Sequence, residues 1–235
     1  MNLNIFDIGI ILILISFIIA GWKNGVVKEA SSFLGIIVVF VLSYSLKGIV
    51  GNFLCSILPF FKFNGLVTMN ILLYHIIAFI LLFLILLSLY KLLLKISNGL
   101  QKIINYTIIL LIPSKVLGAI ISLIEGWIIT FIILVILIMP LGNERMFNNS
   151  KLVNIVLYKT PVLSNMTKSY TNSINEIYDL TSKIKEKEIS TEEANKKTLN
   201  IMLKYKVVNK NTIKKLIKLN KLNEIKDIND VLDKH

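Results

Sequence analysis

The sequence predicts an all-α, polytopic membrane protein with four transmembrane helices, an interfacial or re-entrant helix before the last span, and a C-terminal helical tail. Two observations lead to this fold class. Of the 235 residues, 55% are hydrophobic and the mean hydropathy is +0.73, which is more apolar surface than a soluble domain buries. The apolar residues end near Pro140, and the rest of the chain is polar and rich in lysine. We therefore expect a transmembrane domain over 1–143, a polar linker with partial helix over 144–189, and a basic amphipathic helical tail over 190–235.

Four segments are long and apolar enough to cross a bilayer, which takes about 20 residues in a helix. They cover residues 3–20, 26–46, 66–90 and 116–140. Each is expected to be a helix, because an isolated span satisfies its backbone groups in lipid no other way. The first is not predicted to be a cleaved signal peptide, since no basic residue precedes it and Asp7 stands at its front.

The placement of lysines predicts the orientation of the spans. Lys23 and Lys28 follow the first span, and the segment 91–115 carries four lysines against two in 47–65. Because lysines are enriched on the cytoplasmic side, the N-terminus is predicted to lie outside. The tail is then also predicted to lie outside although it is basic, since long tails cross largely regardless of charge.

Two connecting segments are apolar enough to lie in the membrane interface. Residues 97–115 are apolar on one side, but Asn98, Gly99 and Pro113 interrupt them, which favours an interfacial or re-entrant helix over a fifth span. Residues 51–63 are expected to lie in the outer interface in the same way.

The tail carries signals for three short helices. Ser190 and Glu193 form a capping box, and a helix is expected to follow to about Lys206. Apolar residues at helical spacing predict a second and a third helix: Ile213, Leu216 and Ile217, then Leu222, Ile225, Ile228 and Leu232. Two arrangements are open, a small bundle or helices docked on lipid headgroups with their lysines facing phosphate.

Composition argues against several functional classes. The net charge of +12 comes from 26 basic residues, but Arg145 is the single arginine, so no nucleic-acid partner is expected. The one cysteine, Cys55, excludes an intramolecular disulfide. No cluster of His, Cys, Asp or Glu has metal-ligand spacing, and no phosphate loop or dinucleotide fingerprint is present. We therefore predict no metal, no cofactor and no enzymatic activity.

Small residues recur along the spans. Gly118, Ser122, Gly126 and Thr130 are four residues apart in the last span and form one stripe on its helix. Such a stripe lets a neighbouring helix approach closely. The same spacing appears in the second span and more loosely in the first, so the spans are predicted to form a compact bundle.

The stretch "GWKNGVVKEA" connects the first two spans. Gly21 and Gly25 allow a tight turn or a close backbone approach. Glu29 falls in the first turn of the second helix, where the helix dipole favours a carboxylate. Asp7 is expected at the outer rim, as an N-cap or a carboxylate at headgroup level.

Three features together resemble the colicin V production protein (CvpA) family of bacterial inner-membrane proteins. They are Asp7 early in the first span, a G-x-x-x-G-x-x-K/R-E pattern at 21–29, and "VLGAIISLIEGW" at 116–127. The resemblance covers about residues 1–165. It implies a multi-pass protein of the cytoplasmic (inner) membrane, associated with toxin or bacteriocin production or export and with envelope maintenance, and it brings no agreed chemical activity.

His75 and Glu125 are polar residues inside the third and fourth spans. Each lies nine residues into its span, and the spans run in opposite directions, so both are expected near the bilayer midplane. Ionisable residues inside a membrane suggest a function, and this pair is a candidate to relay protons or hold a substrate. A neutral Glu125 bonded to His75 for packing is the other interpretation.

These observations lead to three functional hypotheses. The first is a non-enzymatic scaffold in the bilayer that recruits or stabilises envelope or export machinery, through membrane-protein partners or as a homo-oligomer. The second is a small oligomeric transporter or channel that uses the polar residues near the midplane. The third is a membrane-tethered module whose basic tail binds anionic lipid or cell-wall polymer. The lack of broken helices at matching places in two halves of the sequence argues against the transporter.

Overall fold

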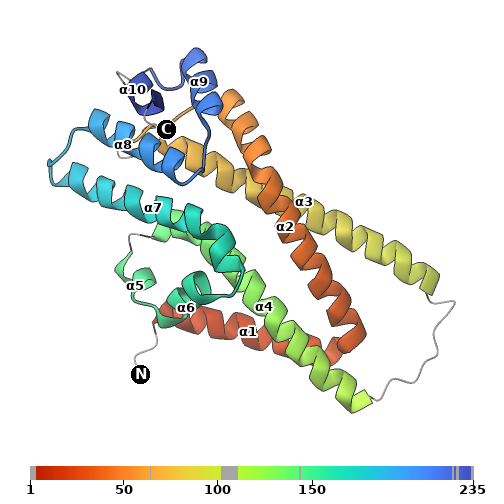
Figure 1. Cartoon of the computed structure of the whole chain (residues 1–235). Coiled ribbons are helices and arrows are strands. Elements are labelled where there is room, and N and C mark those ends of the chain that lie inside the picture. Colours follow the sequence, from red (N-terminus) through yellow and green to blue (C-terminus); the bar gives the residue numbers. More distant parts are fainter. Residues whose placement is uncertain are drawn as a thin grey trace. The chain divides into compact units, whose positions relative to one another are not determined.

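The computed structural model describes residues 4–63, 65–101, 111–142, 144–223, 225 and 228–233, and over these residues the protein is all-α (Figure 1). Among the described residues, four helices are long and apolar enough to cross a membrane, by length and composition. They are α1 (Ile5–Asn24), α2 (Val26–Ile57), α3 (Met69–Gln101) and α4 (Leu111–Leu141). The predicted fold class, a polytopic all-α membrane protein, is confirmed.

Three of these helices run further than their hydropathy indicates. α2 continues through Gly51 to Ile57 and ends just before Pro59, whose ring disfavours a helical conformation in the residue before it. The first half of the segment expected in the outer interface is therefore the last part of α2. Likewise, residues 97–101 continue α3 and residues 111–115 begin α4. The middle of the predicted interfacial or re-entrant helix, 102–110, lies outside the described residues.

The chain divides into two compact units. The first consists of Met1–Ser45, Ile80–Leu134 and Arg145–Lys159, and the second of Leu46–Phe79, Val135–Glu144 and Thr160–His235. α2, α3 and α4 each contribute residues to both units. The sequence-based domain boundaries after residues 143 and 189 stay a prediction.

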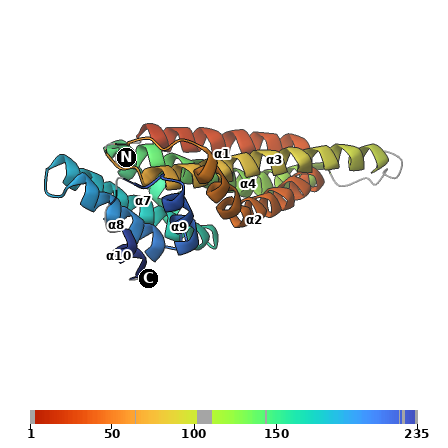
Figure 2. The same ribbon diagram turned by 90° about the horizontal axis from the view of Figure 1, so that it is seen from above.

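In the first unit, α1 meets the first half of α4 (Figure 1 and Figure 2). Two short helices, α5 (Arg145–Asn148) and α6 (Lys151–Lys159), pack against α1. Edge-to-face aromatic pairs, which bring the positive edge of one ring to the face of the other, join α1 to α5 and α2 to α4. Phe6 and Phe147 have ring centroids 5.3 Å apart, and Phe40 and Phe131 have centroids 6.4 Å apart.

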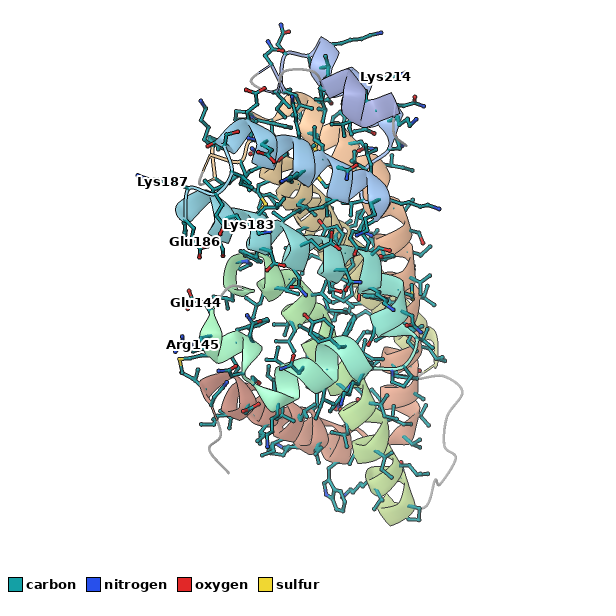
Figure 3. The ribbon with its side chains drawn as sticks, turned by 60° about the vertical axis from the view of Figure 1, so that its left-hand side comes forward. Glu144, Arg145, Lys183, Glu186, Lys187 and Lys214 are labelled. Carbon is teal, nitrogen blue, oxygen red and sulfur yellow. The ribbon has the colours of Figure 1, made fainter. Side chains whose placement is uncertain are left out.

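In the second unit, the tail forms a helical bundle. α7 (Leu163–Lys185) and α8 (Thr191–Lys204) run antiparallel, and α9 (Lys210–Lys218) and α10 (Ile228–Asp233) follow (Figure 1). Of the apolar residues that predicted the last two helices, Ile217 is half-buried and the others are buried: Ile213, Leu216, Leu222, Ile225, Ile228 and Leu232. The last helix is shorter than predicted, because Leu222 and Ile225 lie before the start of α10. Of the two arrangements left open by the sequence, the structure shows the bundle. Lys183, Glu186 and Lys187, by contrast, point outward around the turn between α7 and α8 (Figure 3).

Local hydrogen bonds explain where the tail helices begin and end. The Oγ of Ser190 accepts the N–H of Glu193 at 3.1 Å, which is the N-cap half of the predicted capping box, and the Glu193 carboxylate pairs with Lys197 at 2.6 Å. α7, α8 and α9 are each followed by a residue with positive φ: Lys187, Lys206 and Asn220. The next N–H then bonds a carbonyl of the last helical turn, at 3.0, 2.9 and 3.0 Å. This is the Schellman motif, in which the left-handed position is usually glycine.

Candidate functional site

α1 and α4 make a close backbone contact at Gly21 and Gly118. A Cβ built on Gly118 would lie 2.6 Å from the carbonyl oxygen of Gly21 and 2.8 Å from the carbonyl carbon of Gly25. Because these neighbours are backbone atoms, only glycine fits at position 118 without a shift of the helices. The glycines of the opening stretch thus meet the small-residue stripe of the last span, although they are almost a hundred residues apart in the sequence.

The rest of the stripe continues this contact along α1. The hydroxyl group of Ser122 donates a hydrogen bond of 2.7 Å to the carbonyl oxygen of Phe17. One turn further, a Cβ on Gly126 would lie 2.7 Å from the ring of Phe17, so the aromatic side chain occupies the space that glycine leaves open. The stripe therefore serves helix packing within the first unit.

Gly25 forms the turn between α1 and α2. Its φ of +78° lies in the region that L-residues rarely adopt, and its N–H closes α1 on the carbonyl oxygen of Gly21 at 3.0 Å. The N–H of Val26, at the start of α2, donates to the hydroxyl group of Ser114 at 3.3 Å. A residue of α4 thus caps α2, which the local sequence of the turn does not indicate.

Asp7 joins the start of α1 to the start of α6. The Oδ1 of Asp7 accepts hydrogen bonds from the hydroxyl group of Ser150 at 2.6 Å and from the N–H of Leu152 at 3.0 Å. Its Oδ2 accepts the N–H of Asn4 at 3.1 Å, so Asn4 is the N-cap and Asp7 completes a capping box. With an exposed fraction of 5%, Asp7 is a buried anchor between two segments, and its place at the outer rim of the membrane stays a prediction.

Glu29 and Glu125 form the most unusual group of the first unit, because both are acidic and both are buried, with exposed fractions of 5% and 6%. The amide of Asn24 donates to Oε1 of Glu29 at 2.6 Å, and the hydroxyl group of Ser32 donates to Oε1 of Glu125 at 2.8 Å. Glu29 precedes Ser32 by three residues and therefore lies on the same side of α2, next to the Glu125 carboxyl group that Ser32 binds. Oε2 of Glu125 has no hydrogen-bonding partner among the residues that the structure describes.

α3 closes this region from a third side. The ring of Tyr90 fills the space next to Gly35 of α2, and its hydroxyl group donates to the carbonyl oxygen of Ser31. Gly35 lies three residues after Ser32, so the Tyr90 ring is about one helical turn from the residue that binds Glu125. The small residues of the second span, which predicted a close helix neighbour, therefore accommodate an aromatic ring beside the carboxyl pair.

His75 belongs to the second unit, where its side chain is 1% exposed. Its Nδ1 lies 2.7 Å from the carbonyl oxygen of Ile71, and its ring packs on Gly51, where a Cβ would lie 2.8 Å from the ring carbons. Each residue of the predicted intramembrane pair thus has a partner within its own unit, Ile71 for His75 and Ser32 for Glu125. The pairing of the two residues stays a prediction.

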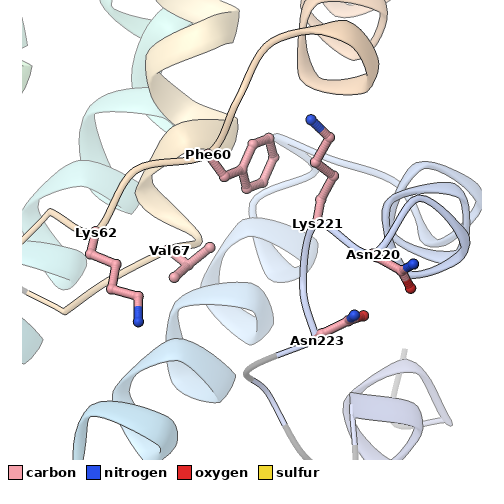
Figure 4. Close-up of a pocket in the computed structure, with 6 residues that line it drawn as sticks. All are labelled: Phe60, Lys62, Val67, Asn220, Lys221 and Asn223. Carbon is pink, nitrogen blue, oxygen red and sulfur yellow. The ribbon is translucent and has the colours of Figure 1, made fainter.

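A cavity of about 250 Å³ lies in the second unit. Its lining consists of Phe60, Lys62, Val67, Asn220, Lys221 and Asn223 (Figure 4). The ammonium group of Lys221 donates to the carbonyl oxygen of Leu58 at 2.7 Å and lies 5.7 Å from the centroid of the Phe60 ring. Lys62 and Lys221 point in different directions, so their charges do not converge on one ligand position.

The described residues include no group of three or more His, Cys, Asp or Glu side chains that could hold a metal ion. In comparisons with known proteins, the family model described as colicin V production protein matches residues 6–161. This range begins next to Asp7 and extends just beyond α6, so it includes both helices that Asp7 joins. No curated protein and no solved structure matches the chain.

Proposed function

The chain belongs to the colicin V production protein family, and from this premise we propose that it is a non-enzymatic scaffold that holds export or envelope proteins together in the membrane. The family and the four apolar helices make it a multi-pass membrane protein linked to colicin V production. The scaffold role is proposed in addition to this link with colicin V production. It includes the proposal that the membrane concerned is the cytoplasmic one.

The use of the polar residues within the first unit supports this role. Asp7 ties α1 to α6, Ser122 ties α4 to α1, and Ser114 caps α2. Each of these side chains fixes one helix to another. In contrast, apolar residues repeat at helical spacing on an exposed face of α1: Ile5, Ile8, Leu12, Ile15 and Ile19. A rigid framework with an apolar outer face suits a protein that acts by assembling with lipid and with other membrane proteins.

Chemical cross-linking of the intact protein in its membrane, followed by affinity capture in mild detergent, tests the scaffold role. We expect a defined set of export or envelope proteins to be captured with wild type and equally with Glu125→Gln, which keeps a side chain of the same shape. We also expect Glu125→Gln to support toxin export and envelope integrity at neutral pH. Normal accumulation of this variant with complete loss of both phenotypes would contradict the scaffold and favour a proton-coupled transporter.

We also propose that the N-terminus and the tail lie outside, as the lysine distribution predicts. Single cysteines at positions 2, 23 and 214, in a Cys55→Ser background, can be labelled with a membrane-impermeant thiol reagent. Cys55 is fully buried, and Lys23 and Lys214 are exposed, so the substitutions at 23 and 214 avoid the packed core. Labelling at 2 and 214 but not at 23 is expected, and the reverse pattern would show the opposite orientation.

A further inference from the structure

The carboxyl groups of Glu29 and Glu125 meet in a site built from three helices. Glu29 is in the first turn of α2, Glu125 is in α4, and Asn24 at the end of α1 supplies a hydrogen bond. The donors to the two Oε1 atoms are a neutral amide and a neutral hydroxyl group. Neither carboxyl group is therefore neutralised by the hydrogen bonds it accepts there.

The charged and titratable groups that face this pair come from α2 and α3. Lys28 of α2 donates to Oδ1 of Asn24 at 2.8 Å, and so reaches the pair through the Asn24 side chain. From α3, Tyr90 contributes a phenol that is uncharged at neutral pH, and Lys91 contributes a positive charge that acts on Glu125. Lys28 and Lys91 are both exposed. Two solvated lysines are compatible with one carboxylate at the site, but they do not replace the direct ion pairing that two buried carboxylates would need.

Two adjacent ionised carboxylates in a buried position repel each other, and both lose hydration. Oε2 of Glu125 also has no donor among the described residues, even though the side chain is more than nine-tenths buried. A single proton removes both difficulties, because it cancels one charge and supplies the missing donor. Two carboxyl oxygens can hydrogen-bond to each other only when one of them carries a proton.

We propose that Glu29 and Glu125 form a proton-binding site in which the two carboxyl groups share one exchangeable proton. Binding forms one O–H bond, takes the proton from water, and changes the charge of the pair from −2 to −1. The shared proton makes a hydrogen bond between the first turn of α2 and α4, so its release breaks a link between the two helices. The site goes beyond a scaffold role and does not depend on it.

Infrared spectroscopy of the full-length protein in phosphatidylcholine vesicles tests the proposal, since the C=O stretch of a protonated carboxyl group is distinct from the bands of a carboxylate. In choline chloride at neutral pH, we expect a band for one protonated carboxyl group per chain, which disappears as the pH is raised. Glu29→Gln and Glu125→Gln should each abolish the whole band, because the carboxyl group that remains has no charged neighbour of the same sign. Glu193→Gln, at an exposed position of α8, is the matched control and should leave the band unchanged.

Three results would overturn the proposal. They are a wild-type spectrum without the band at neutral pH, a band that survives in both glutamine variants, and loss of the band when sodium chloride replaces choline chloride at constant pH. Loss of the band in sodium chloride would mean that the site binds a monovalent cation and not a proton. Ser32→Ala provides a test that keeps both carboxyl groups: the band should persist to higher pH, because ionised Glu125 loses its hydroxyl donor. An unchanged midpoint in this variant would contradict the assigned geometry.

Discussion

Replacing Gly118 by alanine adds one methyl group at the close backbone contact between α1 and α4. The new Cβ would lie 2.6 Å from the carbonyl oxygen of Gly21 and 2.8 and 2.9 Å from two backbone atoms of Gly25, whereas ordinary contacts are 3.4–4 Å. A side-chain rotation cannot relieve this clash, because every neighbour is backbone. The end of α1 and the turn that follows it must therefore move away from α4 by most of an ångström.

The cost follows from the contacts that such a shift loosens. A gap of about 0.5–1 Å forfeits roughly a quarter to a half of the dispersion energy of an atom pair. The contact of Phe17 with Gly126 and the 2.7 Å hydrogen bond from Ser122 to Phe17 would both be affected. Overpacking of this kind typically costs about 1–3 kcal/mol, and the better helix propensity of alanine returns about 0.5–1 kcal/mol. From the middle of both ranges, we expect Gly118→Ala to lower the free energy of unfolding by about 1 kcal/mol.

Gly9→Ala is the matched control, because Gly9 is also in a spanning helix of the first unit but a Cβ there meets nothing within 4 Å. It should gain helix propensity without a clash and be neutral or slightly stabilising. The unfolding of the full-length protein can be followed in mixed micelles of increasing dodecyl sulfate content by the fluorescence of Trp22 and Trp127, which both belong to the first unit. Equal stability changes in the two variants would refute the backbone contact between α1 and α4.

Further predictions concern the anchor of α6 and the tail bundle. Asp7→Asn should weaken the α1–α6 connection by about 1–3 kcal/mol, because a charged acceptor of three hydrogen bonds is lost. The weaker connection should be detected as faster hydrogen exchange confined to α6. Lys187→Gly should stabilise the α7–α8 hairpin by about 1 kcal/mol, because glycine relieves the positive φ of 60°. Lys185→Gly, inside the helix, should destabilise the hairpin. Thermal unfolding followed by circular dichroism compares the two variants, and stabilisation by both would contradict the Schellman assignment. Burial acts to raise the pKa of Glu176, but hydrogen bonds from Tyr205 and Lys204 outweigh it and hold the pKa below its ordinary 4.5. The stabilisation from this carboxylate is therefore fully present above pH 4.5 and is lost as the pH falls through the lower folded-state pKa. In Glu176→Gln, the stability of the bundle should therefore decrease less steeply as the pH is lowered. A decrease as steep as that of wild type would count against this network.

Most elements that depend on local sequence were predicted correctly, but the last tail helix is shorter than predicted, because α10 begins at Ile228 and leaves out Leu222 and Ile225. The four spans were predicted from long apolar segments, because a helix in lipid needs only its own length and hydropathy to be recognised. The start of α8 was predicted from Ser190 and Glu193, since a cap is a contact between residues three apart. The buried faces of α9 and α10 followed from apolar residues at helical spacing, among them Ile213 and Ile228. The full lengths of α2 and α3 could not be predicted from the sequence, because apolar runs do not mark the turns by which a helix extends beyond them.

The composition of the candidate site depends on the tertiary structure. The sequence singled out Glu125 and matched it with His75 by depth alone, and it assigned Glu29 to the helix dipole. In the structure, Glu125 lies beside Glu29 and accepts a hydrogen bond from Ser32, 93 residues away in the chain. Asp7 similarly accepts a hydrogen bond from Ser150, 143 residues away in the chain. Periodicity and capping signals report which face of a helix is apolar and where the helix begins. They carry no information on the rotation and height at which two helices pack, and it is the contact of Gly118 with the α1–α2 turn that brings the carboxyl groups together.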